Sequence, residues 1–280
     1  METITLYNGV VMPLVGLGTF KIDDAAAGEA NIIDAIHCGY RLLDTAQAYG
    51  NEEIVGKAVK RSGVDRHELF LTTKIWYRSF ESPDCEKSVE ASLRKLGTDY
   101  LDLLLLHWPY GNIYNAWRTL EKLYRAGTVR AIGVSNFMES QLLDLLEFND
   151  VAPAVDQVET HLRCQYPSLH ALLRERGIAH QAYSPFGRFK DPTMFTAPAI
   201  TAISEKYGKT PQQIALRFFT QDGISVVPKS MRRERLLANK DLFDISLTDE
   251  EMTALRQMNS DLYLIGNSQD GAFTKAFFAR

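Results

Sequence analysis

The sequence predicts an α/β fold of the (β/α)8 barrel type, a TIM barrel, because a helix followed by a short apolar run recurs along it. This pattern occurs seven times, and one more apolar run precedes the first helix. Strands and helices that alternate in this way form parallel pairs joined by right-handed crossovers. The predicted strand ends lie 22 to 33 residues apart from Gly18 to Tyr183, and the last strand ends near Lys229. Eight near-equal units in 280 residues favour a barrel over a doubly wound open sheet.

Each predicted helix ends near a residue that fits the left-handed conformation of a helix C-terminus. These residues are Gly39, Gly63, Gly97, Gly127, Asn149, Gly177 and Gly223. The apolar runs that we predict as strands cover residues 15–18, 40–44, 69–74, 100–107, 129–135, 154–159, 178–184 and 224–230. A capping box with proline at the first helical position begins the helix at residues 210–213.

Further elements are predicted outside the repeated unit. Residues 3–12 contain Asn8-Gly9 between two short apolar runs, which predicts a β-hairpin that plugs the bottom of the barrel. A second capping box at residues 248–251 predicts an added C-terminal helix. The longest gap between strands holds residues 186–209, a loop and helix where a lid could lie. We expect residues 1–280 to form a single domain.

Composition and charge argue against several classes of protein. The net charge of −4 provides no basic surface for nucleic acid, and no apolar run approaches the roughly 18 residues of a membrane span. The N-terminal residues do not resemble a signal peptide. Cys38, Cys85 and Cys164 lack the spacing of metal ligands. We therefore expect free thiols, no metal site and a reducing cytoplasm.

Two phosphate-binding motifs begin in the sequence but are incomplete. Gly16 and Gly18 match the start of the dinucleotide fingerprint, but Lys21 stands where its third glycine belongs. Residues 50–58 come close to a P-loop, but they have one residue too many and an alanine at the magnesium-binding position. The sequence therefore predicts neither a Rossmann domain nor a P-loop.

Polar side chains end most of the predicted strands, where a TIM barrel has its active site. They are Asp44, Lys74, His107, Ser135, Asn136, Gln157, Tyr183, Ser184, Lys229 and Ser230. Each alone has a structural explanation, such as a loop-facing charge or a hydrogen-bonded histidine. Burying a charged group costs free energy unless the group is paired, so the convergence of this set on one barrel mouth favours a functional site.

Tyr49 lies five residues after Asp44, in the loop over the same mouth. A phenol pKa near ~10 is too high for easy proton exchange at neutral pH, and a nearby Lys74 would lower this pKa. Asp44 would keep the lysine charged, and His107 would donate a hydrogen bond to a carbonyl oxygen. These four residues predict a proton donor aimed at a developing alkoxide.

The same four residues resemble the catalytic tetrad of the aldo-keto reductases, and other strings agree in order along almost the whole chain. Among these strings are Leu106-His107-Trp108-Pro109, Gly133-Val134-Ser135-Asn136-Phe137, Ala182-Tyr183-Ser184-Pro185 and Val227-Pro228-Lys229-Ser230. The similarity is greatest to bacterial members such as the 2,5-diketogluconate reductase group. It implies reduction of an aldehyde or ketone by hydride transfer from NADPH, with Tyr49 as general acid, and no Rossmann fold.

The resemblance also implies which residues bind the cofactor. The residues that would hold its nicotinamide end are Ser135, Asn136, Gln157, Tyr183 and Ser184, with Tyr183 stacked on the ring. The residues that would hold the adenosine 2′-phosphate and the adenine are Lys229, Ser230, Arg235 and Asn239. Lysine and arginine suit a phosphate dianion. Ala238 departs from the family pattern, in which many members have a glutamate against the adenine.

Aromatic residues after the strand ends resemble the substrate pocket of the family. They are Phe20, Trp76, Trp108 and Tyr110, and His107 would orient the substrate among them. Packing at the rim is the alternative role for these rings. The same alternative holds for Met194 and Phe195 in the added loop, which either touch substrate or cover the rim.

Two other functions remain open from the sequence. An NADPH-binding regulatory subunit, like the barrel proteins attached to potassium channels, would keep the cofactor residues and turn over slowly. An aldolase- or isomerase-type barrel would use Lys74 to form a Schiff base, or a phosphate site after the seventh and eighth strands. We expect instead a small-molecule carbonyl substrate, a monomer, and neither nucleic acid nor membrane as a partner.

Overall fold

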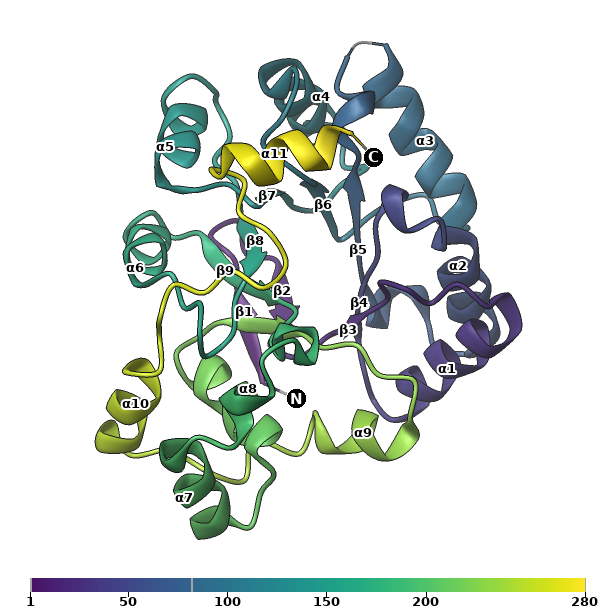
Figure 1. Cartoon of the computed structure of the whole chain (residues 1–280). Coiled ribbons are helices and arrows are strands. Elements are labelled where there is room, and N and C mark those ends of the chain that lie inside the picture. The colour runs from purple at the N-terminus through teal and green to yellow at the C-terminus, as the bar shows by residue number, and fades with distance from the viewer. Residues whose placement is uncertain (1, 82, 280) are drawn as a thin grey trace.

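Within residues 2–81 and 83–279, which the computed structural model describes, eight parallel strands form the predicted barrel (Figure 1). In chain order they are β3 (Leu17–Gly18), β4 (Leu42–Asp44), β5 (Phe70–Ile75), β6 (Leu103–Leu106), β7 (Ile132–Ser135), β8 (Val155–Glu159), β9 (Ala179–Tyr183) and β10 (Ser225–Val227). Each strand pairs with the next one along the chain. The last strand returns to the first, because Val15 forms a parallel bridge with Val226. The (β/α)8 barrel prediction is confirmed.

Helices on the outside of the barrel connect the strands. They are α1 (Ala25–His37), α2 (Glu52–Arg61), α3 (Asp84–Leu96), α4 (Ile113–Arg125), α5 (Glu139–Glu147), α6 (Pro167–Glu175), α7 (Pro198–Tyr207) and α8 (Pro211–Gln221). The predicted helix-ending glycines all have positive φ. Asn149 does not cap α5 in that way: its side-chain amide donates to the Leu145 carbonyl at 2.8 Å. The capping box of Thr210 and Gln213 begins α8, as predicted.

The N-terminal hairpin closes the bottom of the barrel. Strands β1 (Thr3–Thr5) and β2 (Val11–Pro13) pair antiparallel across the predicted turn. Met12 is fully buried in a cluster with Leu42, Phe70 and Leu103. Because these three residues begin β4, β5 and β6, the hairpin fills the end of the barrel opposite the carboxyl ends of the strands. The plug prediction is confirmed.

Three helices follow the last strand: α9 (Arg233–Ala238), α10 (Asp249–Arg256) and α11 (Gly271–Phe278), counted within the described residues. The capping box of Thr248 and Glu251 begins α10, which confirms the added helix. Helix α11, yellow in Figure 1, lies over the barrel mouth, because the Phe277 ring centroid is 4.8 Å from that of Trp108 just after β6. None of the helices in the described chain combines the length and apolarity needed to cross a bilayer.

Candidate active site

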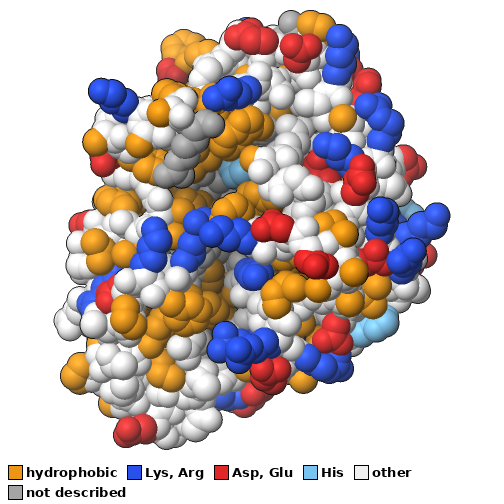
Figure 2. All heavy atoms as spheres, turned by 45° about the vertical axis from the view of Figure 1, so that its right-hand side comes forward, with side chains coloured by type: hydrophobic (Ala, Val, Ile, Leu, Met, Phe, Trp, Pro, Cys, Tyr) orange, Lys and Arg blue, Asp and Glu red, His pale blue; other side chains and the backbone are white. Residues whose placement is uncertain are grey.

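A cavity of about 800 Å³ opens at the carboxyl ends of the barrel strands. The strand-end and loop residues that line it include Asp44, Tyr49, His107, Ser135, Asn136, Gln157, Tyr183, Ser184 and Lys229. Figure 2 shows this face hollowed, with hydrophobic side chains in the hollow and basic side chains gathered near it. The structure therefore brings most of the predicted site residues into one cavity.

A buried ion pair forms the floor of this cavity. Lys74, in β5, is fully buried, and its Nζ lies 2.6 Å from Oδ1 of Asp44 at the end of β4. The same ammonium donates to the Thr45 carbonyl at 2.9 Å. Burial by itself would lower the pKa of Lys74, but Asp44 and Tyr49 together outweigh burial and raise this pKa above its usual value. Lys74 is therefore charged at neutral pH, as the sequence predicts.

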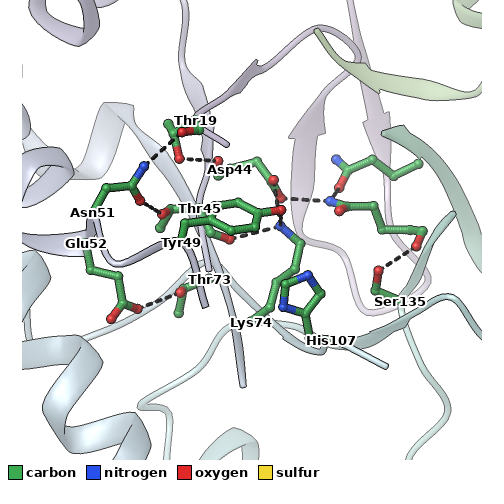
Figure 3. A network of polar contacts seen from close by, with 12 residues as sticks. Thr19, Asp44, Thr45, Tyr49, Asn51, Glu52, Thr73, Lys74, His107 and Ser135 are labelled. Carbon is green, nitrogen blue, oxygen red and sulfur yellow. Dashed lines mark hydrogen bonds and ion pairs between the residues drawn. The ribbon is translucent and has the colours of Figure 1, made fainter. Parts of the chain in front are cut away.

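Tyr49 is the nearest titratable partner of this pair. It ends the 3-10 turn η1 (Gln47–Tyr49), and its Oη lies 3.5 Å from Lys74 Nζ (Figure 3). Burial raises the pKa of Tyr49 above 10, and the opposing effect of Lys74 does not overcome it. Lys74 therefore acts in the predicted direction, but burial outweighs it and the net pKa of Tyr49 is raised. The raised pKa of Tyr49 is useful for reduction, because the phenol keeps the proton that a general acid must donate.

His107 follows β6 and faces the phenol. Its ring lies edge to face with Tyr49, with centroids 5.7 Å apart, and makes a similar contact with Trp76 at 5.4 Å. Burial, followed by the charge of Lys74, lowers the pKa of His107 well below its usual value. Among the described residues, its Nδ1 is buried without a hydrogen-bond partner. A neutral imidazole keeps one N–H donor and one acceptor beside the proton donor.

A buried polar network holds the loop that carries Tyr49 (Figure 3). The Asn51 amide donates to the Thr19 carbonyl at 2.8 Å, and Asn51 Oδ1 accepts from the Thr45 hydroxyl at 2.7 Å. The Glu52 carboxylate accepts from Thr73 on β5 at 2.7 Å. Sequence reasoning assigned no role to Asn51 or Glu52. The only local signal was two polar residues next to a tyrosine, which is typical of any surface loop.

The predicted nicotinamide-binding residues are hydrogen-bonded to one another and to the ion pair. Tyr183 Oη donates to Asn136 Oδ1 at 2.7 Å, and Ser135 Oγ donates to the Gln157 carbonyl at 2.7 Å. Gln157 Nε2 donates to Asp44 Oδ2 at 2.7 Å. Asn136 has a φ of 65°, a left-handed conformation that asparagine tolerates better than most residues. The carboxamide-binding set and the ion pair are thus one connected network.

Of the residues predicted to bind the 2′-phosphate and the adenine, Lys229 lines the cavity, whereas Ser230, Arg235 and Asn239 do not. Lys229 lines the cavity and is exposed, and Arg235 is exposed on α9. Neither takes part in an ion pair among the described residues. Ser230 and Asn239 are nearly buried, and Ser230 Oγ accepts from the Arg232 N–H at 3.1 Å. Two unpaired cations beside a cavity with amide and hydroxyl donors fit a long ligand with a phosphate at one end.

Aromatic residues form the wall nearest to His107. Phe20, Trp76 and Trp108 line the cavity, as predicted for substrate contacts. Tyr110 does not line it: its ring stacks on Trp108 with centroids 5.9 Å apart. Met194 and Phe195 are also absent from the lining, and both are buried among other apolar side chains. Their role in this structure is therefore packing.

Sequence reasoning missed part of this wall. The residues it missed include Arg188 and Phe189 in the turn η4 (Gly187–Phe189), Tyr77 and Arg78 after β5, and Ile265, Phe273 and Phe277 near the C-terminus. The Phe273 and Phe277 rings are four residues apart on α11 and so share one helix face. That spacing, after the N-cap Asp270, was the signal that could have identified them.

Comparison with known proteins agrees with this geometry. Residues 14–260 match the Aldo/keto reductase family model. The chain is 41% identical to glyoxal reductase of Bacillus subtilis, over 93% of this chain and 94% of that protein. Among solved structures, MGS-M4, an aldo-keto reductase enzyme from a Medee basin deep-sea metagenome library, is similar with a TM-score of 0.93 and 37% identity, covering 95% of this chain and 98% of the other.

A Bombyx mori aldo-keto reductase in complex with NADP is also similar, with a TM-score of 0.89 and 34% identity. The alignment covers 95% of both chains. A family match over most of the chain, together with relatives of this identity and coverage, establishes the family. The chain therefore belongs to the aldo/keto reductase family of oxidoreductases.

Proposed function

We propose that the protein reduces an aldehyde or ketone to the alcohol with NADPH, using Asp44, Tyr49, Lys74 and His107. The observation that carries this proposal is the position of Tyr49, a partly buried phenol with a raised pKa that lines an open cavity 3.5 Å from a charged lysine at its floor. Reduction of a carbonyl needs a hydride at carbon and a proton at oxygen. When bound, NADPH supplies the hydride, and the residues of this chain supply the proton.

The proton comes from Tyr49. Its O–H donates to the carbonyl oxygen as negative charge develops there, and the Lys74 ammonium stabilises the phenolate that remains. Asp44 fixes Lys74 in place and keeps it charged, at a distance of 2.6 Å. His107 is neutral and presents an N–H donor to the same oxygen. The resulting alcohol gains one hydrogen on carbon and one on oxygen.

NADP(H) is the cofactor that the donor set favours. Ser135, Asn136 and Gln157 offer hydroxyl and amide groups for a carboxamide, and Tyr183 offers a ring for stacking. Lys229 and Arg235 offer charge for a 2′-phosphate at the rim. The Bombyx mori relative in complex with NADP supports the same choice. The first carbonyl substrates to test are small dicarbonyls, because a relative of 41% identity is named glyoxal reductase.

The test is an NADPH-oxidation screen over glyoxal, methylglyoxal, aromatic aldehydes, aldoses and keto-sugars. We expect turnover with at least one class, and a hundredfold spread in kcat/KM, about 2.7 kcal/mol, would identify it. Tight NADPH binding without turnover on any carbonyl would favour a regulatory subunit. Trapping of a carbonyl compound on Lys74 by borohydride would favour an aldolase-type barrel.

We also propose that residues 1–280 act as one domain, as a monomer in a reducing cytoplasm. Cys38, Cys85 and Cys164 are free thiols, which supports a reducing compartment. Light scattering of the purified protein tests the oligomeric state, with a mass near 31.6 kDa as the expected result.

A further inference from the structure

A buried carboxylate that the proposed chemistry does not use lies beside the active site. Glu159 is the last residue of β8, and it is 1% exposed. Its carboxylate accepts backbone N–H bonds from Leu264 at 2.7 Å, Ile265 at 2.9 Å and Gly266 at 3.1 Å. These residues belong to the yellow segment that connects α10 to α11 in Figure 1. One side chain on the barrel thus binds three successive peptide groups of the C-terminal tail.

His161 adds a fourth donor to this carboxylate. Its Nε2 lies 3.0 Å from Glu159 Oε1, and its Nδ1 accepts the Arg163 backbone N–H at 3.3 Å. A ring that accepts a hydrogen bond at Nδ1 has its proton on Nε2, which donates to Glu159. A buried carboxylate is costly without such donors, and successive backbone N–H groups are a known way to bind an anion. Here the anion belongs to the protein, so the interaction fixes the chain.

The segment bound by Glu159 leads directly to the substrate cavity. Ile265 lines the cavity, and the absence of a side chain at Gly266 lets the Phe273 ring lie on its backbone, because a Cβ there would be 2.2 Å from the ring. Phe273 and Phe277 line the cavity as well. Their ring centroids lie 5.6 Å and 4.8 Å from that of Trp108. We call residues 264–278 the tail wall.

We propose that Glu159 is a positioning residue that holds the tail wall against the cavity and so sets which carbonyl substrates bind well. This inference rests on the proposed carbonyl reduction. Substrates large enough to touch Phe273 or Phe277 depend on Glu159, and small dicarbonyls do not. Among the described residues, Glu159 makes no hydrogen bond to Asp44, Tyr49, Lys74 or His107, so the proton transfer from Tyr49 does not pass through this carboxylate.

The direct test is Glu159→Gln, which keeps the size of the side chain. A glutamine has one acceptor oxygen, and its NH₂ group would face N–H donors of the tail. Because hydrogen bonds to the tail are lost, we expect amide hydrogen exchange at residues 264–266 to accelerate about tenfold. We expect KM for a naphthaldehyde to rise about tenfold, with kcat for methylglyoxal and the Kd of NADPH within about twofold of wild type. Glu175→Gln, an exposed glutamate on α6, is the matched control.

A second pair of variants leaves the barrel untouched. Ile265→Pro removes one of the three N–H donors, and Ile265→Ala keeps it while shortening the side chain. Only the proline variant should accelerate exchange at residues 264 and 266. In the double variant Glu159→Gln/Phe277→Ala, the two effects on KM should not add, because both act through the tail wall.

The outcomes separate the two proposals. A wild-type protein that reduces no carbonyl refutes the proposed function, while amide exchange still tests the role of Glu159. The positioning role is overturned if the wild type is active and both Glu159→Gln and Ile265→Pro leave two quantities unchanged within twofold. These quantities are the amide exchange rates at residues 264–266 and the KM for the naphthaldehyde.

Discussion

The floor of the cavity and its tail wall are held in opposite ways. Lys74 and Asp44 lie on barrel strands with side chains at most 4% exposed, and their ion pair joins two neighbouring strands. Helix α11 has no fully buried residue, and it is held by aromatic contacts, by a hydrogen bond between Thr274 and Tyr110, and by a preceding segment that bonds to Glu159 and to the Asn136 carbonyl. In the proposed function, the ion pair of Lys74 and Asp44 therefore supports the proton transfer, and the tail segment bound to Glu159 supports substrate selectivity. Variants of one should leave the other intact.

The largest effect is expected at the floor. Lys74→Met should reduce kcat by about 10²- to 10⁴-fold, because Tyr49 loses the cation that stabilises its phenolate. The buried Asp44 carboxylate is then unpaired, so stability should fall by about 3–5 kcal/mol. Adding Asp44→Asn should restore much of the stability but none of the activity. Urea unfolding and steady-state kinetics on the same samples measure both. Recovery of turnover in the double variant would contradict the role of Lys74.

An intermediate effect is expected from Lys229 and Arg235, the predicted phosphate-binding residues, which belong to neither the floor nor the tail wall. Arg235→Ala should weaken NADPH binding by about 1.5–3 kcal/mol, equivalent to roughly 10- to 150-fold in Kd, through loss of a charge-assisted phosphate contact. NADH has no 2′-phosphate, so its Kd should stay the same. Fluorescence titration with both cofactors checks this expectation. Equal losses of affinity for NADPH and NADH would show that Arg235 does not bind the 2′-phosphate.

A smaller effect is expected at the tail wall. Phe277→Ala should raise KM for aromatic aldehydes by about 3- to 10-fold, the scale of an aromatic pair, with kcat for methylglyoxal unchanged. Phe278→Ala is the matched control, because that neighbouring ring is 46% exposed and does not line the cavity. A lower kcat for methylglyoxal in both Phe277→Ala and Phe278→Ala would contradict the claim that the tail wall affects selectivity without affecting proton transfer.

The smallest effect is expected from pH. Burial raises the pKa of Tyr49, so its proton is lost only as pH rises above the ordinary phenol range. The rate of the hydride-transfer step should therefore be flat between about pH 6 and 9. Stopped-flow measurement of that step over this range tests the expectation. A rate that falls with a midpoint below pH 8 would mean that Lys74 dominates the pKa of Tyr49 after all.

The same contrast explains what could be predicted from the sequence. Strand ends have a strong local signal, because an apolar run that stops at Lys74 or His107 places that side chain at the barrel mouth. The tail wall has a weak one: nothing next to Ile265 indicates that its N–H meets Glu159, which lies 106 residues away. The effect of Lys74 on the pKa of Tyr49 could be predicted, but the larger effect of burial could not. Burial of the Tyr49 oxygen depends on side chains from several loops, and the spacing between Asp44 and Tyr49 does not reveal it.

Tyr49→Phe tests the central claim most directly, because it removes one oxygen and one proton and keeps the ring that packs against Phe20 and His107. The measurement is single-turnover reduction of a carbonyl at saturating NADPH, with melting curves and the Kd of NADPH on the same protein. We expect the rate to fall by at least about 100-fold, with the melting temperature and NADPH affinity close to wild type. A folded variant with a native-like rate would contradict the assignment of Tyr49 as the proton donor.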